Sequence, residues 1–266
     1  MEGALNHRRS ASTSTSTDRQ PTAEFAQFSV PVRHAATVIV LRDGANGPEV
    51  LMLRRSATAS FLPGAYVFPG GVVDESDRDP DLLDRLTGLS DEQASALLGL
   101  PRFGLAFWVA AVRECFEESG LFLASSAMPG ADTLKQSRTA LLDGHHTFRD
   151  VMKHHDAHVL AGAIVPWSRW VTPVGGPRRF DTRFFVTTAA EARGLSADDR
   201  EMSDLRWFGP NEALNDPDVM LITPTVSALR MLQRSRSAED VITSARSRVQ
   251  LGSIAPQTAL LRENSD

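Results

Sequence analysis

Cysteine and long apolar runs are scarce in this sequence. Cys115 is the only cysteine among 266 residues, so a disulfide within the chain and zinc sites built from several cysteines are both excluded. Arg, Glu or Pro interrupts the most apolar segments, and none of them is long enough to cross a bilayer. The first residues lack the hydrophobic core of a signal peptide. We therefore expect a cytoplasmic protein without a membrane partner.

Basic residues are also fewer than acidic residues. The 28 Lys and Arg residues are outnumbered by 33 Asp and Glu residues, which gives a formal net charge of -5. This balance argues against a protein that mainly coats nucleic acid, but it is compatible with a local basic site for a small phosphorylated ligand. The 42% hydrophobic and 23% charged residues exclude a fully disordered or fibrous chain.

Helical and strand patterns interleave over most of the chain. Residues 1–31 are rich in Ser and Thr and are expected to be a disordered tail, because they have little apolar surface to bury. Strands are predicted at 35–41, 49–54, 161–166, 179–187 and 205–208, with another beginning at 121–123. Helices are predicted at 91–98, 104–119, 148–156 and 223–234. The sequence thus predicts one α/β domain at 32–234, followed by a C-terminal helix and tail at 235–266.

Three glutamates gather at the end of the helix predicted at 104–119. Glu114, Glu117 and Glu118 have the spacing i, i+3 and i+4, which places them on one face of a helix. Arg113 precedes Glu117 by one turn and can reach it. Mg²⁺ prefers oxygen ligands and usually binds a few carboxylates together with substrate phosphates. The spacing alone leaves two interpretations open, a metal site and a solvated acidic stripe.

These residues resemble the signature of the Nudix hydrolase family, G-x5-E-x7-R-E-U-x-E-E-x-G-U, in which U is aliphatic. The second half of the signature fits Arg113, Glu114, Glu117, Glu118, Gly120 and Leu121, with Cys115 in the first aliphatic position. The first half begins at Gly71, and Asp77 replaces the expected glutamate. Arg113 follows Gly71 by 42 positions instead of 14, so an insertion of 28 residues, at about 78–105, interrupts the motif.

The interrupted motif is similar to that of the peroxisomal coenzyme A diphosphatase subgroup of this family. Further segments that resemble this subgroup are Phe61–Ala65, Val67–Asp74, Trp167–Pro173 and Pro177–Phe185. The chain also follows the coenzyme A Nudix motif from Leu51 to Gly71, except that Leu53 replaces its threonine, Ser60 its second arginine and Tyr66 a valine. The resemblance implies a Nudix α/β/α sandwich with a mixed sheet and a helical insertion.

The activity that this resemblance implies is the hydrolysis of a pyrophosphate bond in a nucleoside diphosphate derivative. We expect Mg²⁺ as the cofactor, with Mn²⁺ as an alternative. The expected substrate is coenzyme A or an acyl-CoA, cleaved to 3′,5′-ADP and a 4′-phosphopantetheine product. The alternatives are ADP-ribose, NADH or a dinucleotide polyphosphate as substrate, and a nucleotide-sensing module without catalysis. Family members often form dimers, so a homodimer is also considered.

The resemblance also implies roles for individual residues. Metal ligands are expected from Glu114, Glu117, Glu118 and the backbone near Gly71, while Arg113 orients the carboxylates. The general base is expected to be Glu114 or Glu201, although Glu201 is equally typical of a solvent-facing loop acid.

Several arginines are candidates for phosphate contacts. The candidates are Arg54, Arg55, Arg178, Arg179 and Arg183. Of these we select Arg55, Arg179 and Arg183, and we expect Arg55 or Arg179 to replace the cation lost at Ser60. The alternative for any one of them is an ordinary surface arginine. Arg183 shares a strand face with Asp181 and could simply pair with it. Trp167 and Trp170 are interpreted either as a base-stacking pair or as a small hydrophobic cluster.

Overall fold

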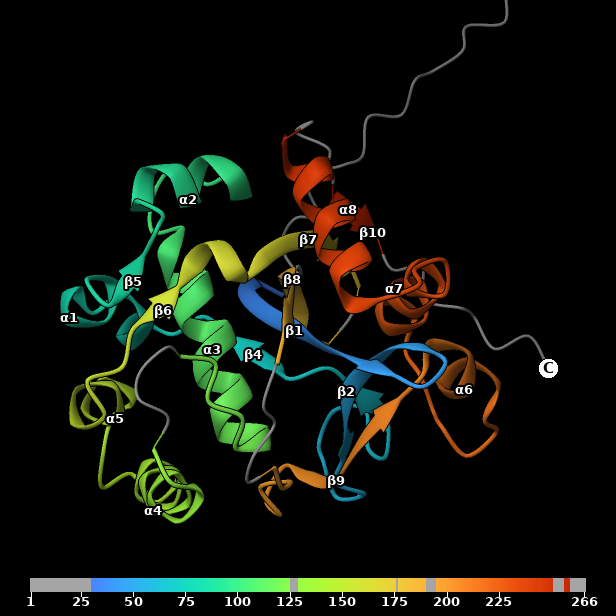
Figure 1. The fold of residues 1–266 in the computed structure, drawn as a ribbon, viewed down its shortest axis with the longest axis horizontal. Coiled ribbons are helices and arrows are strands. Elements are labelled where there is room, and N and C mark those ends of the chain that lie inside the picture. The colour runs from blue at the N-terminus through green and yellow to red at the C-terminus, as the bar shows by residue number, and fades with distance from the viewer. Residues whose placement is uncertain (1–29, 125–128, 176, 190–194, 251–255, 259–266) are drawn as a thin grey trace, which may run out of the picture.

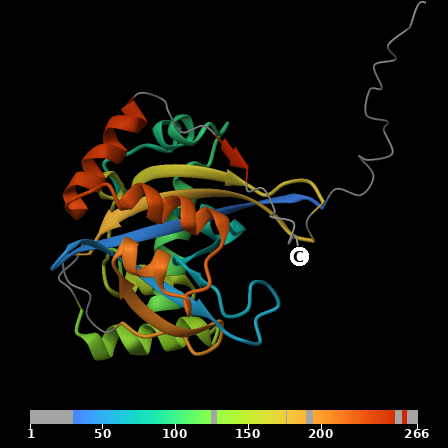
Figure 2. The ribbon, with the colours of Figure 1, turned by 90° about the vertical axis from the view of Figure 1, so that its right-hand side faces the viewer.

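A mixed β-sheet with helices on both faces forms the protein (Figures 1 and 2). The structure is a computed structural model that describes residues 30–124, 129–175, 177–189, 195–250 and 256–258. Nearly all of the predicted N-terminal tail, and most of the tail after the last helix, therefore lie outside the described residues. None of the helices in the described ranges combines the length and apolar character that a membrane span requires.

The first strand organises the sheet. The strand order is β10-β7-β8-β1-β2-β3, where β1 spans Val32–Gly44 and β8 spans Arg179–Thr188. Strand β8 pairs with β1 in parallel, and β2 (Gly47–Arg55) pairs with the end of β1 in antiparallel. The start of β1 pairs with β4 (Gly70–Val72). The remaining strands of this sheet are β3 (Tyr66–Val67), β7 (Val165–Val171), β9 (Met202–Phe208) and β10 (Pro256–Thr258).

Side-chain alternation divides the core into two parts. Val38 and Val40 of β1 point into one hydrophobic cluster, whereas Ile39 and Leu41 point into the other. Successive side chains of a strand project to opposite faces, so both faces of the sheet are buried. The apolar, β-branched run of β1 is the sequence pattern that such a doubly covered strand requires.

Different helices cover the two faces. The first face packs against α3 (Leu105–Ser119), and its core extends to α2 (Asp91–Leu98), α4 (Ala131–Leu142) and α5 (Phe148–His154). The second face is covered by α6 (Pro210–Asn215), α7 (Thr223–Leu232) and α8 (Ala238–Gln250). Figure 1 shows α3 and α8 on opposite sides of the sheet. The predicted α/β/α sandwich is confirmed.

Short elements connect β4 to α3. They are the 3-10 helix η2 (Glu75–Arg78), α1 (Pro80–Leu83), β5 (Leu86–Thr87) and then α2. Strand β5 pairs in parallel with β6 (Val159–Leu160) in a small separate sheet. The interpretation of residues 78–105 as an insertion into the motif stays a prediction.

Three sequence predictions about elements were wrong or incomplete. No strand forms at 121–123; Leu121 and Phe122 are apolar because they are buried in the first core, not because they pair in a sheet. The strand predicted at 161–166 starts later, because residues 161–163 form a 3-10 turn, η3, before β7. Helix α4 was not predicted, since its sequence is largely polar and only a narrow side of it is buried.

Candidate functional site

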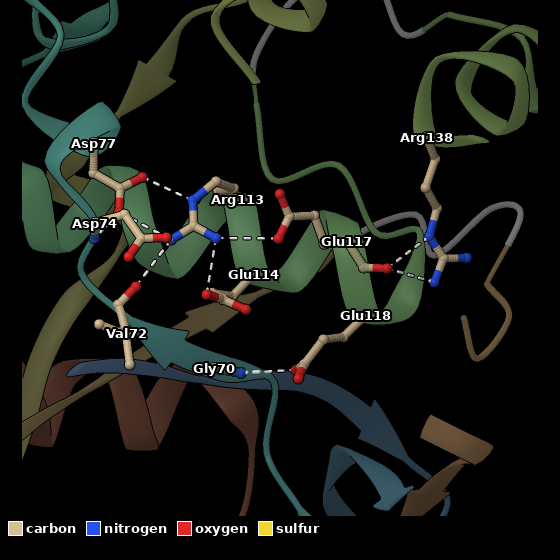
Figure 3. Close-up of polar contacts among 9 residues, drawn as sticks. All are labelled: Gly70, Val72, Asp74, Asp77, Arg113, Glu114, Glu117, Glu118 and Arg138. Carbon is tan, nitrogen blue, oxygen red and sulfur yellow. Dashed lines mark hydrogen bonds and ion pairs between the residues drawn. The ribbon is translucent and has the colours of Figure 1, made fainter. Parts of the chain in front are cut away.

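Helix α3 carries the predicted acidic face. Its apolar residues pack into the first core, which leaves Glu114, Glu117 and Glu118 on the side of the helix that faces β4 (Figure 3). The helix ends at Gly120, whose φ of 73° is a left-handed conformation that favours glycine. The amide of Gly120 donates to the carbonyl oxygen of Phe116 at 2.9 Å. The three carboxylates therefore lie on the last two turns of a helix with a fixed end.

A buried guanidinium group arranges these carboxylates. Arg113 Nε and Nη2 donate to the two carboxylate oxygens of Asp77 at 2.8 and 2.9 Å. Nη2 also donates to the carbonyl oxygen of Val72 at 3.0 Å, and Nη1 contacts Glu114 Oε1 at 2.8 Å and Glu117 Oε2 at 3.1 Å (Figure 3). Asp77, which stands where the family signature has glutamate, thus anchors the arginine that holds two of the three glutamates.

Glycines bring β4 close to the helix. The amide of Gly70 donates to Glu118 Oε2 at 2.9 Å. A Cβ atom on Gly71 would lie 2.3 Å from Glu114 Oε1, and one on Gly70 would lie 2.5 Å from the carbonyl oxygen of Ala36. A side chain at Gly71 would therefore enter the space of the Glu114 carboxylate, whereas one at Gly70 would collide with β1.

Burial makes these carboxylates weak acids. It is the main cause that raises the pKa of Glu114 to about 7, and the nearby negative charge of Glu117 adds to the shift while Arg113 opposes it. The pKa of Glu117 is raised by burial, and that of Glu118 is raised well above its ordinary value by burial and by the charge of Glu114. All three shifts favour the protonated carboxyl groups, and a bound cation would instead favour the ionised forms.

The donor chemistry of this face fits a hard divalent cation. Its side chains offer carboxylate oxygens, and an added cation would relieve their mutual repulsion. Among the described residues no three acidic, His or Cys side chains already converge as a metal cage. The reason is visible in Figure 3, where Glu114 and Glu117 point to Arg113 while Glu118 points to Gly70. Mg²⁺ needs only one or two carboxylates besides water and phosphate oxygens, so a complete cage is not required.

Arg138 of α4 is a residue that the sequence did not reveal. It is buried, and its Nε and Nη2 atoms donate to the carbonyl oxygen of Glu117 at 2.9 and 2.8 Å (Figure 3). Its Nη1 atom donates to the backbone and side-chain oxygens of Ser196, both at 3.0 Å. Arg138 therefore fixes the end of α3 that carries two of the glutamates. It lies on an unpredicted helix, and no motif marks it.

Two further predicted residues lie near the acidic face. The charge of Arg55 lowers the pKa of Glu118, and the charge of Glu201 raises it, although burial and Glu114 are the larger influences. The Nε atom of Arg55 donates to the carbonyl oxygen of Phe61 at 2.9 Å, and the amide of Ser56 donates to the carbonyl oxygen of Glu201 at 2.7 Å. The start of the 56–64 loop and the start of β9 thus border the same space as Glu118.

The other two predicted arginines have structural partners. Arg183 is 2% exposed, pairs with Asp181 at 2.5 Å, and stacks over Phe107 with its guanidinium 5.2 Å from the ring centre. Its side chain is too buried to contact a phosphate in this arrangement. Of the two interpretations that the sequence left open, the ion pair with Asp181 is the one that the structure shows. Arg179 Nε donates to the carbonyl oxygens of Thr172 and Pro173 at 3.3 and 3.1 Å. Neither arginine is joined to the glutamates by any of these contacts.

Comparisons with known proteins agree with this site. The family model of the NUDT19 Nudix domain matches residues 32–103 and 89–232. The acyl-coenzyme A diphosphatase NUDT19 of Homo sapiens is 30% identical over 246 residues, which are 74% of this chain and 64% of that protein. The putative nudix hydrolase 7 of Caenorhabditis elegans is 31% identical over 173 residues, or 63% and 48% of the two chains. The chain thus spans about half to two thirds of the length of these curated relatives.

A solved structure shares the fold. The crystal structure of a NUDIX hydrolase from Alicyclobacillus acidocaldarius superposes with a TM-score of 0.66 and 27% sequence identity. The match covers 80% of this chain and 96% of that chain. The agreement therefore covers most of the chain and is not confined to the glutamate helix.

Proposed function

The chain belongs to the Nudix hydrolase family, and from this premise we propose that it is a Mg²⁺-dependent diphosphatase of coenzyme A or acyl-CoA. One water molecule adds across the P–O–P bridge, and the products are 3′,5′-ADP and a 4′-phosphopantetheine or its acyl form. The observation that carries the proposal is the acidic face of α3, where Arg113 holds Glu114 and Glu117 while the amide of Gly70 donates to Glu118. Relatives described as acyl-coenzyme A diphosphatases support the choice of substrate.

Residues of α3 and β4 would hold the metal. We assign Glu117 and Glu118 as ligands, with Glu114 as a direct or water-mediated ligand and the carbonyl oxygen of Gly71 nearby. Mg²⁺, and Mn²⁺ as an alternative, would neutralise the pyrophosphate charge and acidify a bound water. Arg113 acts as a positioning residue, because its contacts are with carboxylates and the Val72 carbonyl. Arg138 has the same kind of role at the end of the helix.

Glu114 is our first choice for the general base. Glu114 lies beside the two assigned ligands, and burial raises its pKa, which makes it a stronger base than an exposed carboxylate. Glu201 is the rival, because it is exposed and its charge reaches Glu118. The pH dependence of kcat/KM in Glu114→Gln and Glu201→Gln separates the two candidates. The variant that lacks the general base should lose the rise of kcat/KM with pH, and the other variant should keep it.

Two arginines are the best placed to bind the phosphates of the substrate. Arg178 Nη2 donates to Ser60 Oγ at 3.2 Å, so its exposed guanidinium reaches the residue that replaces the second arginine of the coenzyme A motif. Arg55 lies close enough to Glu118 to lower its pKa. We propose that Arg178 supplies the cation missing at Ser60, and that Arg55 binds the pyrophosphate. Arg179, the earlier candidate, is already bonded to backbone carbonyls.

Mass spectrometry of reaction products tests the proposed substrate. The purified protein is incubated with Mg²⁺ and coenzyme A, 3′-dephospho-coenzyme A, ADP-ribose, NADH or a dinucleotide polyphosphate. Coenzyme A should be cleaved fastest, and removal of its 3′-phosphate should lower kcat/KM by about 10- to 150-fold, the effect of one charged hydrogen bond. Arg178→Gln should abolish this preference. Faster cleavage of ADP-ribose would identify another diphosphatase, and cleavage of none would favour a nucleotide sensor.

A further inference from the structure

An arginine-lined pocket lies on the face of the sheet that α3 does not cover. It is open, has a volume of about 510 Å³, and is lined by Trp167, Met231, Arg234, Ser235, Arg236, Asp240, Ser244 and Arg248. These residues come from β7, from α7 and the turn that follows it, and from α8. Trp167 belongs to the second core, whereas the glutamate helix packs on the first core. The pocket is therefore separate from the proposed diphosphatase site.

Two residues that line this pocket, Trp167 and Arg248, carry buried hydrogen-bond donors without partners among the described residues. The guanidinium of Arg248 stacks 3.8 Å from the centre of the Trp167 ring. Trp167 is 5% exposed, and its indole Nε1 is buried with no acceptor among the described residues. The Nε and Nη2 atoms of Arg248 are also buried and have no acceptor among the described residues. Leaving a buried donor unpaired is unfavourable, and such groups are rare in native proteins. Three of them on two stacked side chains indicate a missing acceptor.

Charge identifies the kind of acceptor. Three arginines and one aspartate line the pocket, so its net charge is +2. The carboxylate of Asp240 accepts the backbone amide of Arg236 at 3.1 Å at the start of α8. In the part of the chain that the structure describes, burial alone shifts the pKa of Arg248, downwards, and no carboxylate offsets it. A phosphate monoester carries nearly two negative charges at neutral pH and offers three acceptor oxygens.

We propose that this pocket binds a phosphorylated small molecule through its phosphate monoester. Arg248, held by Trp167, supplies the central guanidinium, and Arg234 and Arg236 supply exposed cations at the rim. Guanidinium groups are suited to phosphate oxygens because they can donate two parallel hydrogen bonds. A volume of about 510 Å³ lies within the range of small-molecule sites. The site does not depend on the proposed diphosphatase activity.

Calorimetric titration of the full chain with AMP tests the proposal. EDTA is present, so that divalent cations do not contribute at the glutamate face. AMP should bind, adenosine should not, and inorganic phosphate should compete with AMP. Arg248→Gln should weaken AMP binding about tenfold or more, since a charged hydrogen bond is lost. The matched control is Arg246→Gln on the same helix, because Arg246 is half exposed and is not part of the pocket lining.

Further variants separate the outcomes. Arg234→Gln removes an exposed cation without disturbing the stack on Trp167, and it should also weaken AMP binding. Arg55→Gln perturbs the proposed diphosphatase site and should leave AMP binding unchanged. Three results would overturn the proposal: no AMP binding at millimolar concentration, wild-type affinity in both Arg248→Gln and Arg234→Gln, or an affinity that falls in Arg55→Gln alone.

Discussion

Asp77 shows how one buried side chain can set the geometry of a whole site. It makes two hydrogen bonds to Arg113, and Arg113 in turn contacts Glu114 and Glu117. A bidentate carboxylate–guanidinium pair fixes the plane of the arginine, so the glutamates receive a defined partner instead of an adaptable one. The aspartate that stands in place of the signature's glutamate contacts Arg113 with both carboxylate oxygens.

Removal of this anchor should affect both stability and activity. Asp77→Ala leaves Arg113 buried without its main partner, and we expect a loss of about 3–5 kcal/mol in the free energy of unfolding. Because Glu114 and Glu117 lose their alignment, kcat of the remaining folded protein should fall by about 10- to 100-fold. Denaturant unfolding and steady-state kinetics measure the two effects. The exposed Asp84→Ala should change neither, and equal effects in the two variants would contradict the role of Asp77.

Asp181 gives a prediction about acid stability. Burial opposes its ionisation, but hydrogen bonds from Arg169 and Arg183 outweigh burial and lower the pKa of Asp181. A lowered pKa in the folded state stabilises the fold above the unfolded pKa, and this contribution disappears as the pH falls through the folded pKa. Asp181→Asn should therefore be less stable than wild type at neutral pH, and the difference should shrink below about pH 4.

Urea unfolding at a series of pH values measures this difference. The exposed Asp218→Asn should follow the wild type at every pH. A stability difference for Asp181→Asn that stays constant, or grows, as the pH falls would contradict the assignment.

At the scale of elements, the sequence predicted those helices and strands that a local residue pattern specifies. Helix α3 was predicted from its apolar period and its final glycine, and β1 was predicted from its continuous apolar run. The grouping of Glu114, Glu117 and Glu118 on one face followed from helical spacing. Contacts between distant segments could not be predicted in this way. Arg138 reaches Glu117 from 21 positions away, and helix α4 that carries it has no strong apolar pattern.

The two glycines of β4 should respond differently to the same substitution. Gly70→Ala places its Cβ against the backbone of β1, with 2.5 Å to the Ala36 carbonyl oxygen, so the strands must move apart. We expect a loss of about 1–3 kcal/mol in stability. Gly71→Ala meets the end of the Glu114 side chain, which can rotate away. Its melting temperature should stay close to wild type while its turnover falls. Thermal unfolding and kinetics compare them, and the opposite pattern would contradict the described packing.

At the scale of the whole molecule, the sheet separates the two proposed sites. The proposed hydrolytic site lies on the α3 face, and the arginine-lined pocket lies on the face covered by α7 and α8. The interleaved strand and helix patterns predicted an α/β domain, and the family resemblance implied the sandwich. Neither predicted the pocket, since Trp167, Arg234 and Arg248 are distant in sequence and form no motif.

This separation predicts that stability and catalysis can be changed independently. Leu229→Ala removes a fully buried side chain from the second core and should lower the free energy of unfolding by about 2–5 kcal/mol. The kcat/KM of the protein that remains folded should match wild type, because Leu229 packs on the face away from the glutamates. Val174→Ala removes a somewhat smaller apolar group at a side chain that is 70% exposed and should alter neither quantity. A fall in kcat/KM for Leu229→Ala would show that the two faces are coupled.

The central claim is that the acidic face of α3 is a metal-dependent hydrolytic site. The most direct test is the rate of coenzyme A hydrolysis at saturating Mg²⁺ for wild type, Glu118→Gln and the exposed control Glu92→Gln. Glu118→Gln keeps the shape of the side chain and removes one carboxylate, so we predict an unchanged melting temperature and a fall in kcat of about 10²-fold or more. Glu92→Gln should behave as wild type. Wild-type turnover in a folded Glu118→Gln variant would contradict the account.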